Sequence, residues 1–155
     1  MSKNELKMEV RKWDSKKWEE GMESKVSLRI YRNLKKEIKE ETCYDNTYSS
    51  VILFRLRTNT LQLNITNRHN NNNNNNNVNC VFCEDQEETR FHFLLFSQAY
   101  TEERQKIFML QQPYEEDLDK VIGKVLFEEE EIEKTKSVLF EMWMKRIKKV
   151  KESTP

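Results

Sequence analysis

The feature that most constrains this chain is a pair of cysteines separated by two residues and followed by a histidine. Cys80 and Cys83 can both bind one metal ion from a tight turn, and His92 would supply an imidazole as third ligand. A tetrahedral zinc site needs a fourth ligand, but the next residue on the expected helical face is Ser97, whose neutral hydroxyl binds zinc poorly. The sequence therefore predicts a Zn²⁺ site at Cys80, Cys83 and His92 that lacks its usual fourth ligand.

The sequence leaves two questions about this site open. The fourth ligand could instead be water or one of four other side chains: Cys43, His69, Glu87 or Glu88. Alternatively, the two cysteines and the histidine pack into a small core without any metal. The odd number of cysteines shows no disulfide pattern, which fits a reducing compartment and predicts an intracellular protein, nuclear or cytoplasmic.

The composition favours helices. The 155 residues include only two Gly and two Pro, and 35% of the residues are charged. We therefore expect a mainly α fold: a small helical domain with an irregular zinc-knuckle-like segment and a long C-terminal helix. Apolar residues make up 36% of the chain, so the core is modest and would gain stability from a metal ion or a partner. No apolar run is long enough to cross a membrane, and the N-terminus does not resemble a signal peptide.

Apolar periodicity predicts the individual elements. Helices are expected over residues 4–22, from 24 or 27 to about 38, 51–57, 90–96, 100–111, 115–127 and 128–151. The run 51–57 could equally be a buried strand, and the capping residues before it favour a helix. Residues 58–68 alternate in polarity, which indicates an extended segment. Trp13, Trp18 and Trp143 occupy apolar helical positions and are expected in the core.

These elements predict four regions. Residues 1–69 would form an N-terminal helical part with a basic arginine segment, and 70–79 an Asn-rich disordered loop. Residues 80–112 would form the degenerate zinc-knuckle segment and 113–155 the C-terminal helices. Residues 80–133 are strongly acidic, whereas the first half and the tail are basic, so the net charge of zero conceals local charge.

A second group of candidate residues contains Arg55, Arg57 and Arg68. Arginines beside Asn and Thr are suited to contacts with phosphates, so these three residues are candidates for binding RNA or DNA. The alternative is a solvated polar face on an apolar segment. The sequence has no Gly-rich phosphate loop, Gly-x-Ser-x-Gly elbow or His-Glu-x-x-His motif, and we therefore expect no enzyme activity.

Several blocks of the chain, in order, resemble a known family. The blocks are residues 27–31, 44–46 and 53–64, then the two cysteines, 87–89, 92–95, and Tyr100 with Glu103 and Arg104. Together they are similar to the C-terminal region of non-LTR (LINE-type) retrotransposon polyproteins, downstream of the reverse transcriptase. The resemblance covers about residues 13–110 and, more faintly, the last helix.

This resemblance implies a Cys-Cys-His-Cys zinc segment and contact with template RNA or target DNA. By position, Cys80, Cys83 and His92 would be zinc ligands, and the segment with Arg55 and Arg57 would contact the nucleic-acid backbone. The chain departs from the family at Ser97, where a cysteine is expected, and in the asparagine run before Cys80. The alternative is a non-catalytic helical module that binds a protein partner, or an inactive retroelement remnant.

Overall fold

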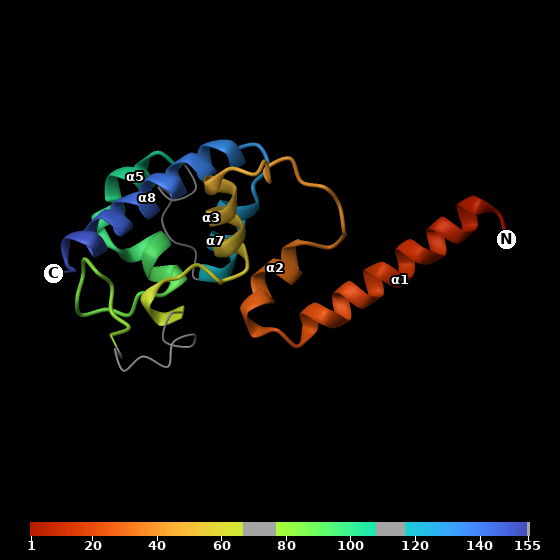
Figure 1. Cartoon of the computed structure of the whole chain (residues 1–155), viewed down its shortest axis with the longest axis horizontal. Helices are drawn as coiled ribbons and strands as arrows, with labels where there is room; N and C mark the ends of the chain where they lie inside the picture. The colour runs from red at the N-terminus through yellow and green to blue at the C-terminus, as the bar shows by residue number, and fades with distance from the viewer. Residues whose placement is uncertain (67–76, 108–116, 155) are drawn as a thin grey trace.

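The computed structural model describes residues 1–66, 77–107 and 117–154, and this part of the chain is mainly helical, as predicted (Figure 1). Its one β-type pairing is an antiparallel bridge between Asn79 and Glu87. The elements, in order, are α1 (Lys3–Glu23), η1 (Val26–Leu28), α2 (Arg29–Leu34), α3 (Tyr48–Arg57), η2 (His92–Phe96), η3 (Gln98–Tyr100), α5 (Thr101–Gln105), α7 (Leu118–Phe127) and α8 (Ile132–Glu152).

The core forms where α3, α7 and α8 pack against one another and against the segment that contains η2 (Figure 1). Helix α8 buries Val138, Leu139 and Met142 on one face, because these residues recur at helical spacing. Trp143 is buried beside them, and its indole N–H donates to the Tyr48 hydroxyl at 3.1 Å. The long C-terminal helix and the buried position of Trp143 are therefore both confirmed.

The predicted run 51–57 is a helix and not a strand. Helix α3 begins after Thr47, whose hydroxyl accepts a hydrogen bond from the Ser50 N–H at 3.3 Å. The segment after α3 is not extended as predicted. Asn59 adopts a left-handed φ of 56°, and the backbone N–H groups of Thr60 and Leu61 both donate to the Arg55 carbonyl. The chain therefore turns sharply, and the alternating polarity of residues 58–63 reflects the burial of single leucines.

Two other predicted helices are shorter in the structure. Helix α2 ends at Leu34 and not near residue 38, because Lys35 leaves the helix and pairs with Glu41 at 2.5 Å. Ile38, at the end of the predicted helix, is 56% exposed. Helix α5 ends at Gln105, and the remainder of the predicted helix from 108 onwards lies outside the described residues.

Helix α1 extends away from the rest of the molecule (Figure 1). A capping box between Ser2 and Glu5 begins it, and Met22 is its one buried residue. The prediction that Trp13 lies in the core is wrong, because its side chain is 61% exposed; Trp18 is partly buried. Across residues 1–66, 77–107 and 117–154, every helix is too short or too polar to span a bilayer.

Candidate metal centre

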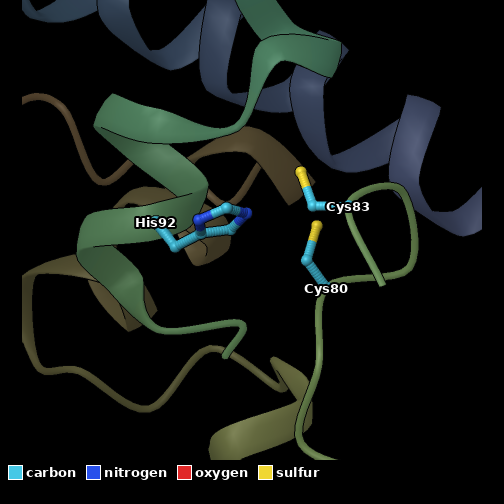
Figure 2. A group of neighbouring side chains, drawn as sticks. All are labelled: Cys80, Cys83 and His92. Carbon is cyan, nitrogen blue, oxygen red and sulfur yellow. The ribbon is translucent and has the colours of Figure 1, made fainter. Parts of the chain in front are cut away.

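The two cysteines lie in a narrow hairpin. The Cys80 N–H donates to the Gln86 carbonyl at 2.7 Å, and the Glu88 N–H donates to the Val78 carbonyl at 2.8 Å. The turn closes with a hydrogen bond of 3.0 Å from the Glu84 N–H to the Cys80 carbonyl, with Glu84 at a left-handed φ of 58°. Figure 2 shows that this turn directs both thiols toward the same space, opposite His92.

His92 reaches this space from η2, which follows the hairpin directly. The Thr89 hydroxyl accepts a hydrogen bond from the His92 N–H at 3.1 Å, as expected for a residue that caps a helix. The turn that follows is wider than an α-helical turn, because the Ser97 N–H donates to the His92 carbonyl five residues earlier, at 2.9 Å. This π-type turn lets Ser97 approach the same site as His92 despite their spacing.

The distances agree with a four-coordinate site. The ligand atoms of Cys80, Cys83 and His92 all lie within 4.8 Å of one another, so these residues can hold a metal ion. The Ser97 Oγ lies 3.6 Å from the Cys83 Sγ and 4.0 Å from the Cys80 Sγ. In a tetrahedral zinc site with Zn–S near 2.3 Å and Zn–N near 2.1 Å, neighbouring ligand atoms are about 3.6–3.8 Å apart. The Ser97 hydroxyl thus lies next to both thiols, at a spacing close to that between zinc ligands.

The site is shielded from solvent. Cys80, His92 and Ser97 are buried, and Cys83 is partly buried. Burial lowers the pKa of His92, so the imidazole is neutral and able to bind a metal. Burial raises the pKa of the Cys80 thiol, although the backbone N–H groups of Phe82 and Cys83 favour its thiolate and oppose that effect.

The His92 Nε2 atom is buried and has no hydrogen-bond partner among residues 1–66, 77–107 and 117–154. A buried polar atom left without a partner costs about 1–3 kcal/mol. Such an atom, facing two thiols, is what a metal-binding imidazole presents before its ion is added. The donor set and this orphaned nitrogen therefore both fit a metal ion.

The other side chains that could supply a fourth ligand lie elsewhere or already have hydrogen-bond partners. Glu88 is fully buried, and its carboxylate accepts hydrogen bonds from the Arg146 guanidinium at 2.7 and 2.6 Å. Cys43 belongs to the hydrophobic core, and Glu87 is exposed. Within the described residues, the metal-binding cluster contains only the two cysteines and the histidine; His69 lies outside those residues.

The three arginines proposed to contact nucleic acid do not share one environment. Arg57 is 2% exposed, and it donates to the Leu126 carbonyl at 2.8 Å and to Glu41 at 2.9 Å. Its guanidinium thus joins α3 to α7 inside the protein and cannot reach a phosphate, which corrects the prediction for this residue. Arg55 is partly exposed on α3, and Arg68 lies outside the described residues.

Two buried arginines near the site were not identified from the sequence. Arg90 donates to the Leu56 carbonyl at 2.8 Å, which satisfies the C-terminal end of α3, and burial lowers its pKa to about 10. Arg146 pairs with Glu88 and thereby joins α8 to the end of the hairpin. A signal for Arg146 was present, because it follows Met142 and Trp143 on the apolar face of α8, where a charged side chain needs a buried partner.

Comparisons of the chain with protein-family models, with curated proteins and with solved structures gave no match. The fold and the site together define a mainly helical protein with a candidate metal centre of two thiols and one imidazole, to which a serine hydroxyl is adjacent.

Proposed function

We propose that this chain is a zinc-stabilised, non-catalytic module that binds nucleic acid, of the class found downstream of reverse transcriptases in non-LTR retrotransposons. The observation that carries the proposal is the cluster of Cys80, Cys83 and His92, with the Ser97 hydroxyl next to both thiols. These are the four positions of the Cys-Cys-His-Cys segment that the ordered sequence blocks resemble.

Zinc is the metal that this donor set suits best, because thiolate and imidazole ligands in a closed site favour Zn²⁺ over hard cations. In the proposed site, Cys80, Cys83 and His92 bind the ion, and the fourth position is taken by the Ser97 hydroxyl or by water. The ion would link the hairpin to η2. We assign the ion a structural role, because Cys80, His92 and Ser97 are buried.

Metal content of the purified chain tests the zinc part of the proposal. We expect up to one zinc per chain after purification without chelator, and none in Cys80→Ser with Cys83→Ser. The matched control is Cys43→Ser, which removes a buried thiol of the core and leaves the site intact. Equal zinc contents in the wild type and in the double variant would exclude this site.

The candidate nucleic-acid contacts are exposed basic side chains beside the hairpin. Lys148 and Lys151 are exposed on the last turns of α8, and Lys149 is partly exposed. The pair between Arg146 and Glu88 fixes this end of α8 against the hairpin. We assign the phosphate contacts to these lysines and not to Arg57, because flexible exposed cations can reach phosphates and a buried guanidinium cannot. Part of their charge also offsets the C-terminal end of the helix dipole.

Binding to single-stranded RNA and DNA at several salt concentrations tests the nucleic-acid part. We expect Lys148→Ala with Lys151→Ala to weaken binding and to reduce the salt dependence, by about 0.7 in the log–log slope for each lost phosphate contact. The matched control is Lys120→Ala with Lys134→Ala, which removes two exposed helical lysines away from the hairpin. Absence of binding at low salt, or equal losses in both double variants, would refute the proposed contact surface.

A further inference from the structure

Helix α1 carries an apolar stripe that nothing in the described structure covers. Leu6, Val10 and Trp13 recur at four- and three-residue spacing, so they share one face of the helix. Their side chains are 55%, 49% and 61% exposed, and the helix extends away from the other elements (Figure 1). Lys17 continues the stripe, and its ammonium lies 5.4 Å from the centre of the Trp13 ring. The other end of α1 is anchored through Met22.

The charges that border this stripe have a specific arrangement. Lys7 and Asp14 lie along one edge, seven residues apart, and Glu9 and Lys16 lie along the other edge at the same spacing. Over residues 6–17, which span the stripe, each edge therefore carries one positive and one negative charge. When two such helices pair in antiparallel orientation, each edge faces the same edge of the partner in reverse order.

Antiparallel pairing with a second copy makes both edges complementary. Lys7 of each copy faces Asp14 of the other, and Glu9 of each copy faces Lys16 of the other. Parallel pairing instead brings opposite edges together and places Glu9 opposite Asp14, which is repulsive. Within the helix, Glu9 pairs with Lys12 and Lys16 pairs with Glu20. Both ion pairs are exposed and weak, so they do not prevent Glu9 and Lys16 from pairing with the second copy.

We propose that α1 is a dimerisation helix that pairs in antiparallel orientation with α1 of a second copy of this chain. In this register, Val10 of each copy faces Trp13 of the other, and Leu6 packs against the aliphatic part of the Lys17 side chain of the other copy. Trp13 is the central anchor, because a large aromatic side chain contributes most when it becomes fully buried at an interface. This inference is independent of the metal site and of nucleic-acid binding, since it uses only α1.

Sedimentation equilibrium of the full chain tests the dimer. The contact is short, so it belongs to the weak class of interfaces, and the measurement should extend to about 1 mM protein. We expect a concentration-dependent monomer–dimer equilibrium that Trp13→Ala weakens about 100-fold or more. Met8→Ala is the matched control, because Met8 is 55% exposed on the opposite face of α1 and should leave the equilibrium unchanged.

Charge exchange tests the orientation. Asp14→Lys places a lysine opposite Lys7 in the antiparallel dimer and should weaken it about tenfold, or about 1.4 kcal/mol. Combining it with Lys7→Asp exchanges both charges of the edge and should restore the wild-type affinity. In a parallel dimer, Asp14→Lys would instead face Glu9 and tighten the association.

Three results would overturn the proposal. A wild-type chain that stays monomeric over the whole range assigns the stripe to a different partner. Tighter association of Asp14→Lys refutes the antiparallel orientation. Equal effects of Met8→Ala and Trp13→Ala refute the stripe as the contact. Circular dichroism of each variant establishes that α1 remains helical, so that a loss of association is not a loss of the helix.

Discussion

Replacement of Ser97 by cysteine tests the geometry of the metal centre directly. The Ser97 side chain is fully buried, and its hydroxyl lies at ligand-to-ligand distance from both thiols. A thiol at this position would lie next to both cysteines and could serve as the fourth zinc ligand. We therefore expect Ser97→Cys to convert a site with three strong ligands into a closed site with four.

The expected gain follows from the binding energy of structural zinc sites. Such sites bind Zn²⁺ with about 10–16 kcal/mol, which corresponds to about 2.5–4 kcal/mol for each of four ligands. Ser97→Cys should therefore bind zinc about 100- to 1,000-fold more tightly than the wild type. With zinc in excess, the same difference appears as stability and should raise the melting temperature by about 5–15 °C for a chain of this size.

Competition with a chromophoric chelator measures the affinities, and thermal unfolding with and without EDTA measures the linked stability. Ser97→Ala is the control, because it keeps the site buried and removes the oxygen. If the hydroxyl binds the ion, Ser97→Ala weakens zinc binding relative to the wild type. If water is the fourth ligand, Ser97→Ala and the wild type bind equally, and Ser97→Cys still binds more tightly.

The reasoning is refuted if Ser97→Cys binds zinc no more tightly than the wild type while its metal-free form unfolds at the same temperature. That result would mean that position 97 does not face the ion. A cobalt-substituted sample gives an independent check, since three thiolate ligands produce a stronger ligand-to-metal charge-transfer band than two.

Three further predictions concern the buried ion pairs. Arg146→Ala should lower the free energy of unfolding by about 3–5 kcal/mol in urea titrations, because it leaves the fully buried Glu88 carboxylate without a positive charge to pair with, and Arg146→Met with Glu88→Leu should recover most of that loss. Arg57→Ala should cost about 3 kcal/mol in the same assay, and Arg57→Lys should cost less because it keeps the charge. Burial would raise the pKa of Glu41, but Lys35 and Arg57 lower it overall, so the stability it contributes is present above its ordinary pKa of 4.5 and is lost as pH falls through the lowered value; Glu41→Gln should reduce this acid dependence.

Local sequence patterns predicted the elements whose stability is mainly local. The scarcity of Gly and Pro, the cap at Thr47 and the periodicity of α8 all predicted helices that the structure contains. The end of α2 was missed because it depends on the pairing of Lys35 with Glu41, and the turn at Asn59 was missed because alternation of apolar residues is not specific to strands. Both depend on contacts between separate segments, which periodicity does not report.

For the candidate site, too, the sequence predicted local contacts but not contacts between separate segments. The spacing of Cys80, Cys83 and His92 predicted three residues that the structure brings together, because the hairpin and the following turn are local. Arg57 was misassigned because an arginine next to polar residues suggests exposure, whereas its partners lie on other elements. The exposure of Trp13 was missed for the opposite reason, since its apolar spacing cannot show whether another element covers it.

The hairpin also has an attachment to the fold that involves no metal. Asn64 donates to the Asn79 carbonyl through its side chain at 2.5 Å and to Glu88 through its backbone N–H at 2.8 Å, and it accepts a hydrogen bond from Arg146 at 3.1 Å. Both arms of the hairpin are thus joined to α8 through one asparagine. In the proposed site, a weak ligand at position 97 would lower the affinity for the ion without releasing these contacts, which hold the hairpin with Cys80 and Cys83 in place. A bound metal would therefore add local stability to the hairpin and η2, whereas packing of α3, α7 and α8 stabilises the core.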